Sequence, residues 1–203
     1  MTILKGRPKH TTGQAMVLSD KEFKRVEAVI SNGKHAIRNH ALLILSFKLG
    51  LRIKELACLT IGDVYQKGQI KSILHLTSDK TKGEKHRDIA LSNPKVISAL
   101  HALIEHHKEN DVIFTEKSPL FKSQKGSKFS ANSLSRVLKE LYLQAGLDKA
   151  SSHSGRRTLI TKLAESNIDI NAIRQIAGHT SLNTTMLYIQ SNPNKLATIL
   201  KNC

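Results

Sequence analysis

Apolar residues recur at helical spacing over most of the chain. Residues 19–22, SDKE, have the order of a capping box, in which a serine hydroxyl and a glutamate three residues later satisfy the first free amides of a helix. Residues 36–50, AIRNHALLILSFKLG, are apolar nearly all round, which predicts a buried central helix ended by a glycine. Residues 53–59, IKELACL, are expected to begin a third helix.

The periodicity changes in residues 69–91. Apolar and polar positions alternate there, which predicts two strands joined by a turn at KTKGEK. Residues 111–114, DVIF, are expected to form one more short extended segment. The other helical patterns occupy residues 94–110, 131–146, 154–166, 170–178, 181–190 and 194–202. The predicted fold is therefore mainly α with a small antiparallel β-sheet.

The chain divides into a short arm and one domain. Its 203 residues suffice for a single domain with a hydrophobic core. Residues 1–18 are expected to form a basic N-terminal arm, because KGRPK at residues 5–9 has no acidic neighbour and Pro8 and Gly13 disfavour a helix. Residues 19–203 are expected to form the domain.

The charge of the chain indicates a polyanionic partner. The chain has 32 Lys and Arg residues against 16 Asp and Glu, a net charge of +16, which favours nucleic acid first and an anionic membrane surface second. The sequence has neither an apolar run near the ~18 residues of a membrane span nor the apolar stretch of a signal peptide. Two distant cysteines, Cys58 and Cys203, fit a reducing compartment. We expect a cytoplasmic protein.

Three short motifs contain residues that could act on a phosphate. In HSGRRT, His153 and Arg156 are three apart and could hold a phosphate oxygen, or simply lie on a solvated helix face. In GLRIKEL, Arg52 follows an apolar helix and could form a plain ion pair with Glu55 or be aimed at an anion with Glu55 behind it. In TKGEK, Lys82 lies at a predicted hairpin tip. It could be an ordinary exposed lysine, or its ammonium group could reach the leaving oxygen of a phosphate ester.

Other kinds of chemistry have little support in the sequence. The chain lacks a Gly-x-x-x-x-Gly-Lys-Ser/Thr loop, so nothing suggests ATP use. His101 and Glu105 share a helix face and could bind a metal, but a solvated polar face is the favoured interpretation. The acidic residues do not cluster as a two-metal nuclease requires. We therefore expect neither a metal nor a cofactor.

The order of the motifs GLRIKEL, TKGEK, HSGRRT and AGHTSLNTTMLY resembles the catalytic domain of the tyrosine recombinase (phage integrase) family. The resemblance implies a site-specific recombinase that cleaves and rejoins DNA through a 3'-phosphotyrosine intermediate. It assigns the nucleophile to Tyr188, transition-state stabilisation to Arg52 and Arg156, the general acid to Lys82, proton handling to His153, a phosphate hydrogen bond to His179 and support of Arg52 to Glu55. A non-catalytic DNA-binding regulator with the same fold and a relaxing, type IB topoisomerase-like enzyme are the alternatives.

The chain departs from the family pattern in two ways. Gly155 stands where the family often has Leu, which we expect to change packing rather than chemistry. We also expect the chain to lack the helical core-binding domain that usually precedes the catalytic domain in this family, as the short inverting recombinases of fimbrial phase switches do. The basic arm resembles an AT-hook, so Lys5, Arg7 and Lys9 are candidate DNA contacts, with a generic basic tail as the alternative.

The resemblance also implies partners. We expect double-stranded DNA, self-association into a tetrameric synapse, and accessory DNA-bending proteins. The terminal segment NKLATILKN, residues 194–202, resembles the tail that docks on a neighbouring subunit, although it could also pack within its own domain. A location on the nucleoid follows from the DNA partner.

Overall fold

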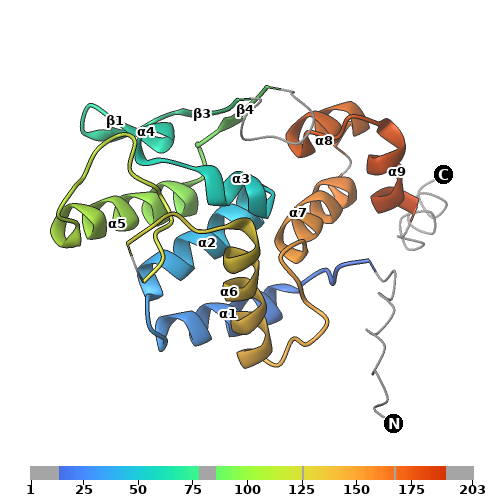
Figure 1. The fold of residues 1–203 in the computed structure, drawn as a ribbon. Helices are drawn as coiled ribbons and strands as arrows, with labels where there is room; N and C mark the ends of the chain where they lie inside the picture. Colours follow the sequence, from blue (N-terminus) through green and yellow to red (C-terminus); the bar gives the residue numbers. More distant parts are fainter. Residues whose placement is uncertain (1–13, 78–85, 125, 167, 191–203) are drawn as a thin grey trace, which may run out of the picture.

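The fold is helical with two small antiparallel sheets (Figure 1). The computed structural model describes residues 14–77, 86–124, 126–166 and 168–190. The helices are α1 (Asp20–Ser31), α2 (Ala36–Lys48), α3 (Ile53–Cys58), α4 (Ile61–Val64), α5 (Pro94–Asn110), α6 (Ala131–Gln144), α7 (Ser154–Glu165), α8 (Ile170–Ala177) and α9 (Leu182–Gln190). The strands are β1 (Tyr65–Gln66), β2 (Gln69–Ile70), β3 (Ile73–Leu76) and β4 (Arg87–Ala90). The predicted fold class is confirmed.

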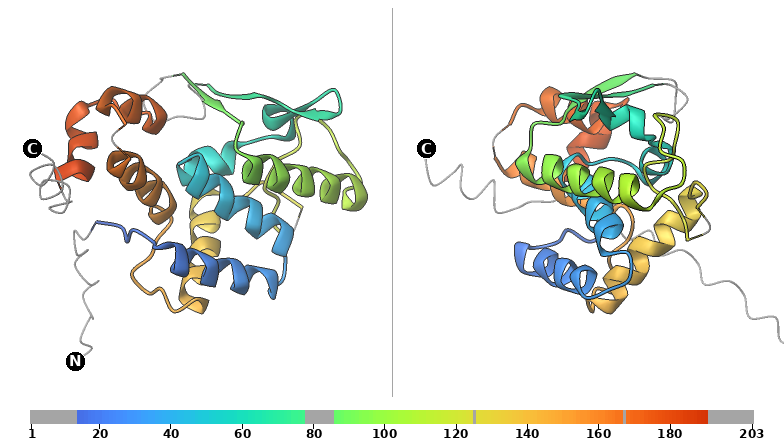
Figure 2. Two further views of the ribbon diagram at one scale, coloured as in Figure 1. Left: turned by 180° about the vertical axis from the view of Figure 1, so that it is seen from behind. Right: turned by 90° about the vertical axis from the view of Figure 1, so that its left-hand side faces the viewer.

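The central helix is α2, as its nearly uniform apolar sequence predicts. It packs against α1, α5 and α7, and the view from behind in Figure 2 shows it between α5 and α1. Its residues 41–45 are fully buried in the main core. A second, smaller apolar cluster joins α7 to α8 through Ile160 and Ile173. These two clusters place α7 between the main core and the C-terminal helices α8 and α9.

Most predicted boundaries are confirmed. The capping box at the start of α1 is present, with the backbone amide of Ser19 donating to Glu22 Oε2 at 2.8 Å. The central helix ends at Lys48, and Gly50 takes the left-handed conformation with φ of 60°. The alternating segment forms the antiparallel pair β3–β4, with Leu74 opposite Ile89. The predicted turn at residues 80–85 lies outside the described residues.

Two details differ from the sequence-based expectation. Helix α4 and the β1–β2 hairpin were not predicted from the sequence. The tight turn of the hairpin has positive φ at Lys67 and Gly68. A Lys-Gly pair between short polar strands is a weak turn signal, and these strands bury too little surface to show an alternating pattern. The expected extended segment at 111–114 was wrong, since these residues form a loop in which Val112 is fully exposed.

The glycine of the HSGRRT motif is explained by helix packing. Gly155 lies where α7 crosses α2, and a Cβ built there would be 2.3 Å from Ser46 Oγ and 2.9 Å from Phe47 Cδ2. A larger side chain would push the two helices apart. The departure from the family pattern at this position is therefore a matter of close helix contact, as the sequence suggested.

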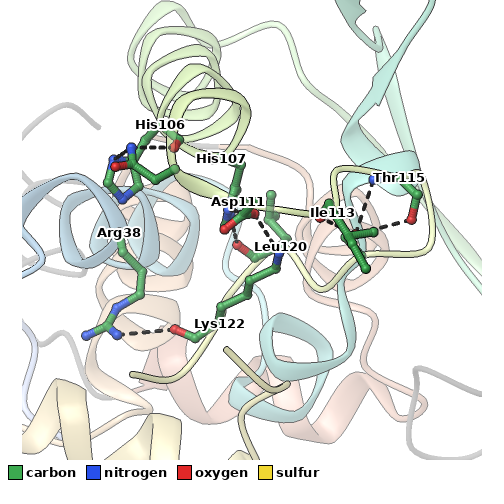
Figure 3. Close-up of polar contacts among 10 residues, drawn as sticks. Arg38, His106, His107, Asp111, Ile113, Thr115, Leu120 and Lys122 are labelled. Carbon is green, nitrogen blue, oxygen red and sulfur yellow. Dashed lines mark hydrogen bonds and ion pairs between the residues drawn. The ribbon is translucent and has the colours of Figure 1, made fainter. Parts of the chain in front are cut away.

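Polar contacts fix the loop that follows α5 (Figure 3). The His107 ring lies 2.8 Å from Asp111 Oδ2 through Nδ1 and 2.9 Å from the Leu120 carbonyl oxygen through Nε2. Lys122 donates to Asp111 at 2.5 Å, and Arg38 donates to the Lys122 carbonyl at 3.2 Å. We call these four side chains, Arg38, His107, Asp111 and Lys122, the α5 cluster. They hold an irregular segment against α2 and α5.

Across the described residues, no helix combines the length and the apolar character needed to cross a membrane.

Candidate active site

The C-terminal end of α8 gathers three arginines from distant parts of the chain. The last carbonyl groups of a helix lack partners within the helix and carry partial negative charge, so they attract cations. Three successive carbonyls here each accept a hydrogen bond from a different guanidinium. The pairs are Arg87 with Ile176 at 2.9 Å, Arg156 with Ala177, and Arg52 with Gly178 at 2.8 Å. The three arginines come from β4, α7 and the residue before α3.

A single buried carboxylate lies between two of these arginines. Glu55 is 1 % exposed and is in the first turn of α3. Its Oε1 accepts from the Arg52 guanidinium at 2.8 Å, and its Oε2 accepts from the Arg52 backbone amide and from Arg87, both at 2.7 Å. The predicted contact between Glu55 and Arg52 is therefore present, with Arg87 as a third partner.

Arg156 is buried beneath the end of α8. It is 6 % exposed, and besides Ala177 it donates to the Gly50 carbonyl at 2.8 Å. Burial, together with the nearby charges of Arg52 and Arg87, lowers its pKa to about 10. A pKa of about 10 still leaves Arg156 charged at neutral pH, so it is a fixed cation next to Arg52.

His179 and Tyr188 meet beside these arginines. Their rings stack with centroids 5.8 Å apart and an angle of 18° between the planes. His179 is 9 % exposed, and its Nδ1 lies 2.9 Å from the Thr185 hydroxyl on α9. Burial lowers the pKa of His179 to about 4, helped by the charges of Arg156, Arg52 and Arg87. The imidazole is therefore neutral at pH 7 and has one N–H to donate.

Helix α9 holds Tyr188 in a half-buried position. Its ring packs against the apolar cluster of α7 and α8, and the Arg157 guanidinium lies 5.7 Å from the ring centroid. The turn between α8 and α9 brings the ring back over His179, nine residues earlier in the chain. The two ends of the motif AGHTSLNTTMLY are thus side by side in space.

The surroundings of these residues carry excess positive charge. The guanidinium groups of Arg52, Arg87 and Arg156 all donate to the end of α8, and the carboxylate of Glu55 bonds only Arg52 and Arg87 of the three. A pocket of about 400 Å³ opens between β4 and the end of α8. It is lined by Arg52, His86, Arg87, Asp88, Arg174, Gln175, Ile176, Gly178, His179 and Thr180. Such a pocket is suited to an anionic group.

The other candidates are His153, at the start of α7, and residues outside the described part of the chain. His153 is the N-cap of α7 and is exposed, whereas Arg156 is buried within the helix. Lys82 lies in residues 78–85, outside the described part of the chain. The same applies to Lys5, Arg7 and Lys9 of the arm and to the terminal segment 194–202.

The possible metal site on α5 does not take shape in the described part of the chain. Glu105 pairs with Lys108 at 2.8 Å, which is the solvated polar face that the sequence favoured. Among the described residues, no group of three or more His, Cys, Asp or Glu side chains is placed to hold a metal ion.

Sequence reasoning missed Arg87 and Thr185. Arg87 is the first residue of β4 and is two positions from the buried Ile89, so strand alternation places both on the inner face. A charged residue at an inward strand position was the available signal. Thr185 gave no comparable signal, because its role as neighbour of His179 depends on the turn between α8 and α9.

Known proteins resemble this chain over most of its length. The model of the phage integrase family matches residues 16–195. The chain is 31% identical to tyrosine recombinase XerA of Pyrococcus furiosus over 84% of this chain and 56% of that protein. It is 28% identical to tyrosine recombinase XerD of Oceanobacillus iheyensis over 85% of this chain and 56% of that protein. The chain thus spans about half the length of the curated relatives it matches.

Solved structures share the fold. A crystal structure of XerA recombinase superposes with a TM-score of 0.74 at 26% identity, covering 94% of this chain and 65% of the other. XerH site-specific recombinase, bound to a palindromic difH substrate, gives a TM-score of 0.71 at 23% identity, covering 91% of this chain and 51% of the other. With a family model that matches nearly the whole chain and a fold shared with these recombinases, the chain belongs to the phage integrase family.

Proposed function

We propose that this chain is the catalytic part of a site-specific DNA recombinase that cleaves and rejoins DNA through a 3'-phosphotyrosine intermediate. The observation that carries the proposal is the convergence of Arg52, Arg156, His179 and Tyr188 at the end of α8. These side chains come from residues up to 136 positions apart, as the numbers of Arg52 and Tyr188 show. Their meeting place is cationic, and the scissile phosphate of DNA is anionic.

The arginines bind and stabilise the phosphate. Arg52 directs one N–H to Glu55 and one to the Gly178 carbonyl, which leaves other donors of its guanidinium for a ligand. Arg156 holds a second positive charge close by. Charge builds on the nonbridging oxygens when the phosphorus becomes five-coordinate, and fixed cations stabilise that state more than the ground state. The neutral His179 donates its single N–H to a nonbridging oxygen.

The covalent step exchanges one phosphate ester for another. The phenolic oxygen of Tyr188 forms a bond to phosphorus, and the bond from phosphorus to the 5'-oxygen breaks. The phenolic proton passes to a base, a task in which His153 assists, and Lys82 gives a proton to the departing 5'-oxygen. The reverse attack by the 5'-hydroxyl of another strand rejoins the DNA. Because the ester bond is retained, the exchange needs no ATP.

Exchange between two DNA duplexes requires several copies of the chain. We propose that four copies assemble on paired DNA, with the terminal segment 194–202 docking on a neighbour and accessory proteins bending the DNA. The arm residues Lys5, Arg7 and Lys9 would add contacts in the minor groove or to phosphates. The net charge of +16 supports DNA as the partner, and a protein with this partner would be found on the nucleoid.

A suicide substrate tests the proposal directly. DNA that flanks the gene is prepared as duplexes with a nick near each possible cleavage position, so that the released fragment diffuses away and the phosphotyrosine accumulates. We expect a covalent protein–DNA adduct on a denaturing gel with the wild type, and none with Tyr188→Phe, which keeps the ring and removes the nucleophilic oxygen. Tyr65→Phe is the matched control, because Tyr65 packs against Phe114, away from the site.

The outcomes separate the alternatives. Specific DNA binding without any adduct would favour the non-catalytic regulator. Adduct formation with supercoil relaxation but no inverted or excised product would favour the topoisomerase-like enzyme. An adduct formed by Tyr188→Phe would remove Tyr188 as the nucleophile. Adduct formation should persist in excess chelator, and a strict magnesium requirement would contradict the mechanism.

A further inference from the structure

Arg87 connects the two halves of the candidate site. Its side chain is 10 % exposed and extends from β4 between α3 and the end of α8. One end of the guanidinium donates to Glu55 Oε2 at 2.7 Å, and the other donates to the Ile176 carbonyl at 2.9 Å. Both terminal nitrogens of Arg87 are therefore engaged with protein atoms.

The contact with Glu55 controls where Arg52 points. Glu55 Oε2 is shared between Arg87 and the Arg52 backbone amide, while Oε1 takes the Arg52 guanidinium. Arginine and carboxylate groups prefer a two-bond fork. With Arg87 removed, Oε2 could accept a second bond from the Arg52 guanidinium and draw it away from the phosphate. Arg87 thus limits the Arg52 guanidinium to one hydrogen bond with Glu55.

The contact at the end of α8 controls the turn that carries His179. Gly178 has φ of 58° and lies against the Arg87 side chain, so that a Cβ built there would be 2.7 Å from Arg87 Nη1 and 2.8 Å from Cδ. The glycine before His179 is needed both for its left-handed backbone and for this close approach. The position of Arg87 and the position of the Gly178–His179 turn therefore depend on each other.

We propose that Arg87 is a positioning residue for the phosphate site: it sets the direction of Arg52 through Glu55 and fixes the Gly178–His179 turn, without binding the phosphate itself. The proposal rests on the proposed recombinase function for its catalytic readout. Its structural half, the fixing of the turn, can be tested without that function.

The catalytic test compares Arg87→Met and Arg87→Lys with the wild type in single-turnover cleavage of the suicide substrate. A misplacement on the order of 1 Å can cost about 10²-fold in rate, so we expect a loss of about that size at saturating DNA for Arg87→Met. The dissociation constant for DNA should change little. Arg87→Lys keeps the charge and one of the two bonds, so it should recover part of the rate.

A double substitution identifies the path through Glu55. If Arg87 acts by way of Glu55, the combined loss in Arg87→Met with Glu55→Gln should be much smaller than the product of the two single losses. Fully multiplicative losses would overturn this half of the proposal. Arg38→Met is the matched control, since Arg38 is also a partly buried arginine bonded to a backbone carbonyl and a side-chain oxygen, but it lies in the α5 cluster (Figure 3). Its cleavage rate should equal that of the wild type.

Hydrogen exchange tests the turn independently of catalysis. The backbone amides of Gly178 and His179 donate to the carbonyls of Gln175 and Arg174. These two amides should exchange faster in Arg87→Met and stay as in the wild type in Arg38→Met. Unchanged exchange at both amides would overturn the proposal even if the wild type forms no adduct. If Arg87→Met does not fold, Arg87→Lys decides by the same measurements.

Two rate outcomes would also overturn it. An unchanged cleavage rate at saturating DNA in folded Arg87→Met would show that Arg87 positions nothing the reaction needs. A larger dissociation constant for DNA, with an unchanged cleavage rate at saturating DNA, would show that Arg87 contacts the DNA directly. If the wild type forms no adduct, that result counts against the recombinase function alone. The hydrogen-exchange experiment would still test whether Arg87 fixes the Gly178–His179 turn.

Discussion

Two polar clusters in this molecule contain the same kinds of side chain. The α5 cluster and the group at the end of α8, which we call the arginine cluster (Arg52, Glu55, Arg87, Arg156 and His179), each combine a buried histidine, one carboxylate and arginine. In the α5 cluster both ring nitrogens of His107 face oxygen atoms, and Asp111 also accepts from Lys122 (Figure 3). Asp111 pairs with Lys122 there, while Arg38 donates to the neutral oxygens of Asn39 and the Lys122 backbone, so the cluster has one surplus positive charge. It joins α5 to the loop after it.

The arginine cluster has a larger surplus of positive charge. It contains three guanidiniums and one carboxylate, which bonds two of them. Burial, together with the surplus charge, lowers the pKa of His179 to about 4 and that of Arg156 to about 10. In the α5 cluster burial opposes the charge of Asp111, but the bonds from Lys122 and His107 outweigh it and lower the pKa of that carboxyl. A larger excess of positive charge, acting together with burial, therefore distinguishes the arginine cluster from the α5 cluster.

The largest expected contrast comes from Arg-to-Lys changes in the two clusters. Lysine keeps the charge but loses the planar fork that donates to two groups at once. Arg156→Lys should reduce single-turnover cleavage by about 10²- to 10³-fold, the range found when one transition-state donor is lost. Arg38→Lys loses the same fork in the α5 cluster and should cleave at the wild-type rate. Equal losses in both variants would show that the effect reflects stability, not phosphate binding.

The pH dependence of the unfolding free energy measures how much the lowered pKa of His179 in the arginine cluster affects stability. The folded protein keeps His179 neutral down to a pH of about 4, whereas the unfolded chain protonates it near 6.5. The unfolded state therefore binds more protons between these values, and stability is lost as pH falls from about 6.5 to about 4. The loss is up to about 3 kcal/mol.

The variant His179→Gln isolates this contribution. It has no group to titrate at this position, so its unfolding free energy should lack this fall, while the carboxyl groups of both proteins contribute alike. Denaturant unfolding of wild type and variant at about pH 7.5, 5.5 and 4.5, which span this range, gives the difference. A difference that does not change with pH would contradict the lowered pKa of His179.

Changes in the α5 cluster should lower stability and leave the cleavage rate unchanged. Asp111→Asn removes the charge that accepts from Lys122 and His107, and charged hydrogen bonds contribute about 1.5–3 kcal/mol each in favourable cases. We expect a loss of about 1–3 kcal/mol in unfolding free energy, with cleavage per folded molecule unchanged. Asp148→Asn, at an exposed position, is the matched control. A cleavage defect in folded Asp111→Asn would break the distinction between the two clusters.

The sequence predicted the parts of the fold that depend on local patterns. These parts are the capping box at Ser19, the apolar helix α2 and the β3–β4 pair. Each follows from the spacing of apolar and polar residues that are close together in the sequence. The β1–β2 hairpin and α4 were not predicted, because such short elements bury few side chains. Within the site, the contact of Arg52 with Glu55 was predictable because the two are three residues apart on one helix start.

The rest of the site depends on long-range packing. Arg87 is 32 residues from Glu55 and 89 from Ile176, so no local pattern could reveal that it joins them. His153 and Arg156 looked like a pair by spacing, but α7 begins after His153 and only Arg156 is buried. The family resemblance named the residues at the site, and the structure added how the end of α8 holds them.

The smallest expected effect concerns the hydroxyl beside His179. Thr185 is fully buried, and its Oγ1 lies 2.9 Å from His179 Nδ1. A neutral imidazole has one N–H, so Nε2 can donate to a phosphate oxygen only when Nδ1 accepts from the Thr185 hydroxyl. Thr185→Val keeps the shape and removes that donor. Losing one hydrogen bond of about 1 kcal/mol should slow cleavage by about 5- to 10-fold with unchanged DNA affinity.

Thr184→Val, at the exposed neighbouring position of α9, is the matched control and should cleave normally. Nitrogen chemical shifts of the His179 ring report the tautomer directly. We expect the proton on Nε2 in the wild type and a mixture of tautomers in Thr185→Val, because nothing then fixes the proton. A slower Thr185→Val enzyme with the wild-type tautomer would show that the hydroxyl supports α9 rather than the ring. A wild-type ring protonated at Nδ1 would mean that His179 accepts from the phosphate site instead of donating to it, and its proposed role would have to be reversed.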